Sequence, residues 1–337
     1  MGTPKKSTSK PEPRAQARGS KKTTTKKVTK KNPRARMPAS KKKLPSAYHL
    51  TDPSVDVYVG DCREILPTLA PVRDAAVDLV FADPPFNWDR AYDRWHDKMP
   101  DDEYLDFTYA WLDLCVGALR DHGAMWVNIP DDWAAEIVVH LKSRGLEMVN
   151  WCVWHYRFGQ NTQGRFINSK VHALYFMKDR RHPDRRWNSG EILEASDRAT
   201  TYGDPRTMSK KTGTAGMRTP MDVWYGKHWG RIQGNNKERR PNHDNQIPEV
   251  YLERVIRACS HEGDLVMDPF LGSGTTALVA RELRRRSLAT EYSPENAASA
   301  VERIEAGTVR VKHGEPTRHA SAIFAPRGTI SVEGDVS

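Results

Sequence analysis

The stretch VDLVFADPPFNWDRAYDRW (residues 77–95) runs an apolar segment into an acid, two prolines and an aromatic residue. Because proline cannot donate a hydrogen bond to a sheet, Pro84 and Pro85 end the strand that this stretch begins. The Asp83 carboxylate and the Phe86 ring therefore follow the carboxyl end of an apolar strand on stiff backbone. We interpret this as a site that needs an acid and an aromatic side chain in fixed positions.

Around this stretch, apolar runs alternate with segments of helical periodicity. The predicted strands cover residues 55–59, 77–82, 124–129, 149–154, 171–176, 265–267 and 287–290. Helices are predicted over residues 103–119 and 131–141, behind Pro248 as a first-turn residue, from near Thr275, and after the Ser293 cap. This alternation predicts an α/β fold with a mostly parallel twisted sheet and helices on both faces. Residues 178–242 break it with many polar residues, glycines and prolines, so we interpret them as an insertion.

A second stretch, GDLVMDPFLGSGTTALVARELRRR (residues 263–286), places an acid and a glycine-rich turn after another predicted strand. The strand ends at Asp268, and the Gly-Ser-Gly turn after it lets a ligand approach the backbone. Twenty-three residues later the next strand ends at Glu291, where a carboxylate can accept both ribose hydroxyls. A turn that uses glycine for packing alone and a phosphate-binding turn remain alternatives. Against the second, the Walker lysine is missing and the dinucleotide G-x-G-x-x-G pattern is incomplete.

Together, Asp-Pro-Pro-Phe at one strand end and DPFLGSGTT at another resemble the signatures of the N4/N6 amino DNA methyltransferases, which use S-adenosylmethionine. The segments GDCREIL (60–66) and HDNQIPEVYLERVIRACSHEGDLVMDPFLGSGTT (243–276) also resemble family segments, and the resemblance covers roughly residues 54–306. The acid of the first motif precedes that of the second by 185 residues, with the insertion between them. This is the permuted motif order of the β group. The resemblance implies a Rossmann-like methyltransferase fold with circularly permuted motifs.

The resemblance assigns the chemistry to Asp83, Pro84, Pro85 and Phe86. An exocyclic amine on a base is a poor nucleophile because its lone pair is delocalised into the ring. The Asp83 carboxylate and the Pro84 carbonyl are expected to accept its two N–H groups, and the rigid prolines fix both acceptors. Phe86 is expected to offer a face on which a base stacks after it has been extruded from the duplex.

The resemblance also implies S-adenosylmethionine as methyl donor and no metal. The methionine end is expected along the glycine turn, the ribose on Glu291, and the adenine near Asp61 and Cys62, with an ordinary turn residue as the alternative for Asp61. The expected cofactor residues are Asp61, Cys62, Gln246, Asp268, Pro269, Phe270, Gly272, Ser273, Gly274, Thr275 and Glu291. The chain departs from the family pattern at Ile247, where lysine is frequent, and at residues 171–173, where a His-Glu pair is common.

The choice of acceptor atom rests on two further features. All four cysteines follow Asp, Leu, Trp or Ala, so the Pro-Cys pair usual in carbon-5 cytosine methylation is missing. Within the family, aspartate at position 83 favours adenine N6, whereas serine there favours cytosine N4. We therefore predict a site-specific adenine N6 methyltransferase acting on double-stranded DNA. The alternatives are a cytosine N4 methyltransferase, a catalytically inactive DNA-binding protein of the same fold, and an amino-methyltransferase acting on RNA or protein.

Charge divides the chain into segments. Residues 1–45 hold 16 Lys and Arg against the single acid Glu12 and almost nothing apolar. This composition predicts a disordered basic tail that contacts DNA phosphates, with a solubilising extension as the alternative. A methyltransferase domain is predicted over residues 46–312, and a flexible C-terminal tail over residues 313–337.

The insertion 178–242 is the predicted target-recognition region. It carries +7, whereas the rest of the chain behind the basic tail carries −12. Its segments RRHPDRRWN (180–188) and NNKERRPNH (235–243) combine Arg, Asn and Lys, which suit base edges and phosphates. A solvated loop is the alternative.

Composition excludes several classes of protein. The four cysteines are scattered, with no CxxC pair and no metal-like His/Cys cluster, which predicts a reduced intracellular protein without disulfides or structural zinc. No apolar run approaches the roughly 18 residues of a membrane helix, and the N-terminus lacks a signal-peptide core. We expect a cytoplasmic, nucleoid-associated monomer or homodimer with no membrane partner. A partner restriction endonuclease cannot be read from the sequence.

Overall fold

The structure is a computed structural model that describes residues 46–309, except residues 90–97, 157–161, 201, 209–214, 226–228, 233, 235, 241–242 and 244. The predicted tails, residues 1–45 and 313–337, lie outside the described residues, so the expectations for both stay predictions. Within the described part, no helix is long and apolar enough to cross a membrane.

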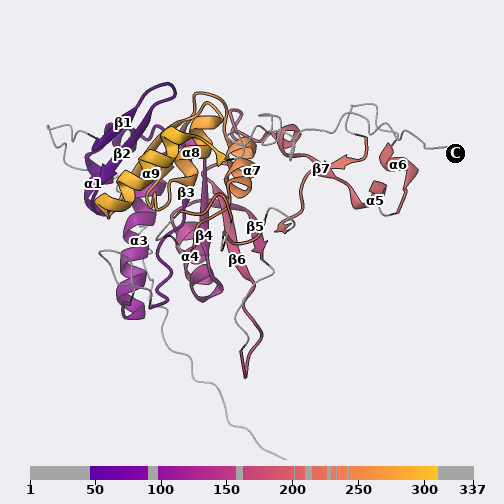
Figure 1. Ribbon diagram of the computed structural model, residues 1–337, viewed down its shortest axis with the longest axis horizontal. Coiled ribbons are helices and arrows are strands. Elements are labelled where there is room, and N and C mark those ends of the chain that lie inside the picture. The colour runs from indigo at the N-terminus through magenta and orange to yellow at the C-terminus, as the bar shows by residue number, and fades with distance from the viewer. Residues whose placement is uncertain are drawn as a thin grey trace, which may run out of the picture. The chain divides into compact units, whose positions relative to one another are not determined.

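One mixed sheet of nine strands organises the fold (Figure 1). Its strands, in spatial order, are β1 (Tyr48–Leu50), β2 (Val55–Val59), β11 (Arg286–Glu291), β10 (Leu265–Asp268), β3 (Val77–Ala82), β4 (Leu119–Ile129), β6 (Lys170–Met177), β5 (Glu147–His155) and β9 (Val223–Trp224). The neighbours from β2 to β4 are all parallel, and so are β5 and β9; β1 and β6 run antiparallel to their neighbours. The predicted strands and the mostly parallel sheet are confirmed, with β4 beginning earlier than expected.

Helices cover both faces of this sheet (Figure 1). The main ones are α3 (Asp101–Ala118), α4 (Asp131–Ser143), α7 (Glu249–Cys259), α8 (Thr275–Glu282) and α9 (Pro294–Ala306), with short helices α1 (Cys62–Ile65), α2 (Ala70–Arg73), η1 (Leu66–Thr68) and η2 (Ser189–Ile192). Contacts link α1 to α3 and α3 to α4, and separately α7 to α8 and α8 to α9. Pro248 is the N-cap of α7 rather than a first-turn residue, and Ser293 caps α9 as predicted.

Parallel register brings the ends of several strands to one edge. Met267 of β10 pairs with Val80 of β3, and Glu291 of β11 pairs with Val59 of β2. All residues of β3 and β10 are buried. The side chains that can reach a ligand therefore follow directly at the strand ends, as is usual in parallel α/β sheets. The two motifs quoted above thus meet at the carboxyl edge.

The predicted insertion 178–242 is partly integrated into this domain. β9 extends the main sheet beside β5, and Trp224, Trp229 and Ile232 are buried. The Trp154 indole on β5 donates to the Trp229 carbonyl at 2.6 Å. The remaining described part holds the helices α5 (Asp197–Thr200) and α6 (Pro205–Met208) and a two-stranded sheet of β7 (Glu194–Ala195) and β8 (Met217–Arg218). Charge and turn content did not reveal the buried aromatic side chains of this segment.

Candidate active site

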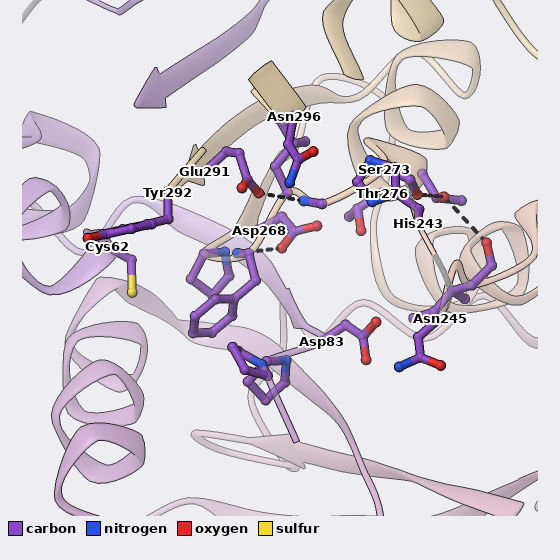
Figure 2. A pocket seen from close by; sticks show the side chains of 18 of the residues that line it. Cys62, Asp83, His243, Asn245, Asp268, Ser273, Thr276, Glu291, Tyr292 and Asn296 are labelled. Carbon is purple, nitrogen blue, oxygen red and sulfur yellow. Dashed lines mark hydrogen bonds between the residues drawn. The ribbon is translucent and has the colours of Figure 1, made fainter. Parts of the chain in front are cut away.

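An open cavity of about 210 Å³ lies at the carboxyl edge of the sheet, where both motifs contribute to its wall. Figure 2 shows the Glu291, Asp268 and Asp83 carboxylates within this one cavity. All the predicted catalytic and cofactor residues except Gly274 line it: Asp61, Cys62, Asp83, Pro84, Pro85, Phe86, Gln246, Asp268, Pro269, Phe270, Gly272, Ser273, Thr275 and Glu291. The fold therefore joins two sequence motifs in a single site.

The first motif is held by hydrogen bonds from two helices. Tyr104 of α3 donates its hydroxyl to the Pro85 carbonyl at 2.6 Å, and Trp133 of α4 donates its indole N–H to the Phe86 carbonyl at 3.0 Å. Among the described residues, the Pro84 carbonyl has no such partner, so it stays available as an acceptor. The rigidity that we attributed to the prolines thus also depends on side chains remote in sequence.

Phe86 is buried, with 6% of its surface exposed. Its ring packs edge-to-face on Trp88 at 5.0 Å between centroids. It lines the large cavity and also a second cavity of about 10 Å³, whose wall includes Tyr156, Arg231 and Asn245. Phe86 therefore lies between the cavity of about 210 Å³ and a small aromatic-lined space.

The second motif forms a tight turn around two carboxylates. Asp268 Oδ1 accepts the Phe270 amide at 2.9 Å. Glu291 accepts the amides of Gly272 and Ser293, one on each oxygen, at 2.9 and 3.0 Å. Gly272 has a φ of +51°, a conformation that L side chains rarely adopt, and no atom would crowd a Cβ there. The open backbone at Gly272 suits the close approach of a ligand.

Gly274 does not line the cavity, in contrast to the expectation for it. A Cβ at this position would lie 3.0 Å from the Ala300 Cβ of α9, and its φ is +78°. The residue is thus the left-handed N-cap of α8 and permits close packing of α9. Ser273 and Thr275 do line the cavity, but their hydroxyls bond to each other at 3.0 Å, and Arg303 donates to Thr275 at 2.8 Å.

Three further predicted cofactor residues line the cavity in different ways. Asp61 caps α1 by accepting a hydrogen bond from the Arg63 amide at 2.8 Å, and its carboxylate pairs with the Arg63 guanidinium. Asp61 therefore acts as an ordinary turn residue, the alternative that we gave for it, and it also lines the cavity. Burial raises the pKa of the Cys62 thiol to about 12, so this cysteine is a neutral wall residue. The Gln246 amide accepts from the Arg240 amide and donates to the Glu238 carbonyl, so its polar groups hold the end of the insertion.

Three carboxyl groups, those of Asp83, Asp268 and Glu291, lie together in the cavity (Figure 2). Burial raises the pKa of Asp83 to about 7, and the nearby Asp268 carboxylate adds to the effect. Burial likewise raises the pKa of Asp268 to about 6, with the Glu291 charge contributing, and burial raises the pKa of Glu291. Three carboxylates that are hard to ionise together favour a cationic ligand, because its charge would stabilise their ionised forms.

These pKa shifts predict a pH effect on stability. Because the folded pKa of Asp83 lies above its unfolded value of about 3.9, its contribution to stability is full below that value and is lost as the pH rises towards 7. We expect Asp83→Asn to stabilise the protein at pH 8 by about 4 kcal/mol, and hardly at all near pH 4. Thermal denaturation over pH 4–8 measures this, with the exposed Asp121→Asn as control. Equal stability of wild type and variant at pH 8 would contradict the raised pKa of Asp83.

Several wall residues were missed by sequence reasoning. They are Gly60, Phe81, Phe107, His243, Asn245, Ile247, Leu252, Leu271, Thr276, Tyr292, Ser293 and Asn296. Asn128, at the end of β4, was also missed, although it donates to Asp83 at 2.6 Å. A polar residue within the otherwise apolar run of residues 124–129 was the available signal for Asn128.

One cluster lies away from the cavity. His122, His182 and Asp184 offer ligand atoms within 4.8 Å of one another, although the sequence predicted no metal-like grouping. His122 is already bonded to Asp78 at 3.0 Å. Asp78 and His122 belong to the amino-terminal parts of β3 and β4, at the opposite edge from the cavity, so the cluster takes no part in its chemistry.

Comparisons with known proteins give matches to DNA methyltransferases. The N6/N4 methyltransferase family model, described as DNA methylase, matches residues 77–302. The chain is 28% identical to the type II methyltransferase M.HpaI of Haemophilus parainfluenzae over 245 residues, which covers 72% of this chain and 73% of that one. It is 31% identical to M1.MboII of Moraxella bovis, covering 66% and 87%, and 32% identical to M.BamHI of Bacillus amyloliquefaciens, covering 70% and 54%.

Solved structures share the fold. A PvuII DNA methyltransferase described as cytosine-N4-specific superposes with a TM-score of 0.55 at 17% identity, covering 73% of this chain and 85% of that one. TTHA0409 of Thermus thermophilus, solved in complex with S-adenosyl-L-methionine, gives 0.50 at 22% identity, covering 74% and 93%. The predicted fold class is confirmed, and the family model spans both motifs. The chain belongs to the N4/N6 family of DNA methylases.

Proposed function

We propose that this DNA methylase transfers a methyl group from S-adenosylmethionine to adenine N6 of a base extruded from double-stranded DNA. The observation that carries the proposal is the single cavity that contains both Asp83 and the Asp268–Glu291 turn. The family provides the general reaction, and this geometry supports a donor site and an acceptor site side by side.

The cavity wall fits the proposed donor. When bound, S-adenosylmethionine supplies an electrophilic methyl group on a positively charged sulfonium. Asp268 and Glu291 provide negative charge for a cation, and the open backbone at Gly272 admits a ligand. The Glu291 carboxylate, oriented by two backbone amides, retains lone pairs for ribose hydroxyls. TTHA0409, which has the same fold, was solved with this compound.

The first motif fits the proposed acceptor. The Asp83 carboxylate and the Pro84 carbonyl can each accept one N–H of an exocyclic amine, which draws the nitrogen towards a geometry with a localised lone pair. The neighbouring carbonyls of Pro85 and Phe86 are occupied by Tyr104 and Trp133, so the acceptors in this loop are few and fixed. With a pKa near 7, Asp83 can also take the proton that the amine loses.

Adenine is favoured by Asp83 at the first motif position, where the cytosine N4 enzymes of the family commonly have serine. Cytosine N4 is the second candidate, and the shared fold of the cytosine-N4-specific PvuII enzyme keeps it open. An inactive DNA-binding protein fits less well, because the Asp-Pro-Pro-Phe motif and the open glycine turn are both intact around one cavity. The insertion 178–242 is our candidate for reading the target sequence.

Expressing the protein in a host that lacks DNA methylation identifies the base that it methylates. We expect mass spectrometry of the digested nucleosides to show N6-methyladenine, and modification sequencing to place it at one recognition site. The Asp83→Ala variant serves as the negative control. N4-methylcytosine alone would overturn the choice of adenine, and unmodified DNA from a folded, expressed wild-type protein would overturn the proposed activity.

A further inference from the structure

The Asp83 carboxylate is held by two hydrogen bonds in series that lie outside the first motif. Asn128 Nδ2 donates to Asp83 Oδ1 at 2.6 Å, and the Tyr251 hydroxyl donates to Asn128 Oδ1 at 3.2 Å. The three side chains come from the loop after β3, the end of β4 and α7. Asn128 is 1% exposed and Tyr251 is fully buried. Buried polar side chains that complete one another's hydrogen bonds form a rigid group.

Asp83 and Tyr251 each engage one end of the Asn128 amide. An asparagine side chain has an acceptor end and a donor end. Because the ionised Asp83 carboxylate can only accept, the donor Nδ2 must face it, and the Tyr251 hydroxyl donates to the Oδ1 that remains on the other side. In the reversed orientation two oxygens would face each other at 2.6 Å, and Asp83 would lose its partner.

The Tyr251 ring is itself fixed by aromatic neighbours. It packs edge-to-face against Phe81, Trp154 and Trp224, with centroid distances of 5.7, 5.6 and 5.2 Å. Trp224 belongs to β9 of the insertion. The hydroxyl position is therefore set jointly by the core of the sheet and by the segment that we assign to target recognition.

We propose that Asn128 and Tyr251 are a positioning pair that engages Asp83 Oδ1 and leaves Oδ2 to accept an N–H of the target amine. The inference rests on the proposed function, because it concerns the same carboxylate. The Asn128 hydrogen bond also favours the ionised carboxylate and so opposes the rise in the pKa of Asp83 that burial causes. Without Asn128, Asp83 would be both free to rotate and harder to ionise.

The activity test compares Asn128→Ala and Tyr251→Phe with wild type. For Asn128→Ala we expect kcat to fall about 10- to 100-fold at pH 8, with little change in the KM for S-adenosylmethionine. Since the pKa of Asp83 should rise, the loss at pH 6 should be about tenfold greater than at pH 8. Tyr251→Phe should also lower kcat at pH 8 and lower it further at pH 6, in each case by less than Asn128→Ala does.

A matched control and a double variant separate positioning from general packing. Tyr175→Phe removes the hydroxyl of another buried tyrosine, on β6, and should leave the pH profile unchanged. In the Asn128→Ala background, Tyr251→Phe should have no further effect on kcat, because the amide to which Tyr251 donates is gone. Additive losses, or losses equal at pH 6 and pH 8, would assign both residues to packing alone.

A measurement without DNA decides the inference independently of the proposed function. In protein labelled with carboxyl-¹³C aspartate, the Asp83 resonance is identified by its absence in Asp83→Asn. We expect its titration to move to higher pH in Asn128→Ala and, by less, in Tyr251→Phe. An unchanged titration in both variants would overturn the positioning pair, whereas absent methyl transfer in wild type would overturn only the proposed function.

Discussion

Replacing Asp83 with alanine should lower the rate of methyl transfer by a factor of about 100 or more, while S-adenosylmethionine affinity stays within a few fold. The side chain is bonded to Asn128 and follows β3 at the first motif, whereas the turn expected to hold the donor is built from Asp268, Gly272 and Glu291. The substitution therefore removes the acceptor of the amine N–H and leaves the donor turn intact. Single-turnover kinetics on a cognate duplex, with calorimetry for the donor, measure the two effects separately.

Asp83→Asn is the conservative companion of this variant. It keeps the shape of the side chain and can still accept from Asn128 through its oxygen, but its second group is then an N–H donor that repels the amine. We expect Asp83→Asn to be as inactive as Asp83→Ala, although it should be more stable than wild type at pH 8. Turnover near that of wild type in either folded variant would remove Asp83 from the chemistry.

Gly272→Asp should abolish S-adenosylmethionine binding in a protein that still folds. No neighbouring atom crowds a Cβ at this position: the nearest is the Phe270 carbonyl oxygen at 3.7 Å. The new side chain would therefore fit the ligand-free protein, apart from the cost of a positive φ, and would occupy the space where a ligand meets the backbone. Asp268→Ala should also abolish binding, because Asp268 Oδ1 holds the amide of Phe270 and its charge lies in the cavity.

Gly145→Asp provides the matched control for this experiment. Gly145 also has a positive φ, +89°, and open space around it, but it lies in the exposed turn between α4 and β5. The two variants thus introduce the same residue at similar backbone cost, in different places. Calorimetry should show wild-type affinity for Gly145→Asp and no measurable binding for Gly272→Asp. Unchanged affinity in a folded Gly272→Asp protein would refute our placement of the donor.

Local features of the sequence determined where the strands end and which residues come directly after them. The prolines after Asp83 and the glycine turn after Asp268 act on the backbone within a few residues, so each could be recognised without knowledge of the rest of the chain. Parallel strands place their carboxyl ends at one edge, and for this reason the meeting of Asp83, Asp268 and Glu291 followed from the alternating pattern. The family resemblance rests on these same local motifs.

Tertiary structure alone decided which side chains complete the site. Asn128 and Tyr251 are 123 positions apart, and only the pairing of β3 with β4 and the docking of α7 place them in line behind Asp83. Similarly, two glycines of one turn have different roles, since Gly272 faces the cavity and Gly274 faces Ala300. A sequence pattern reflects backbone preferences over a few residues. The partner of a buried hydrogen bond, or the side chain that packs against a glycine, depends instead on packing between elements that are distant in the sequence.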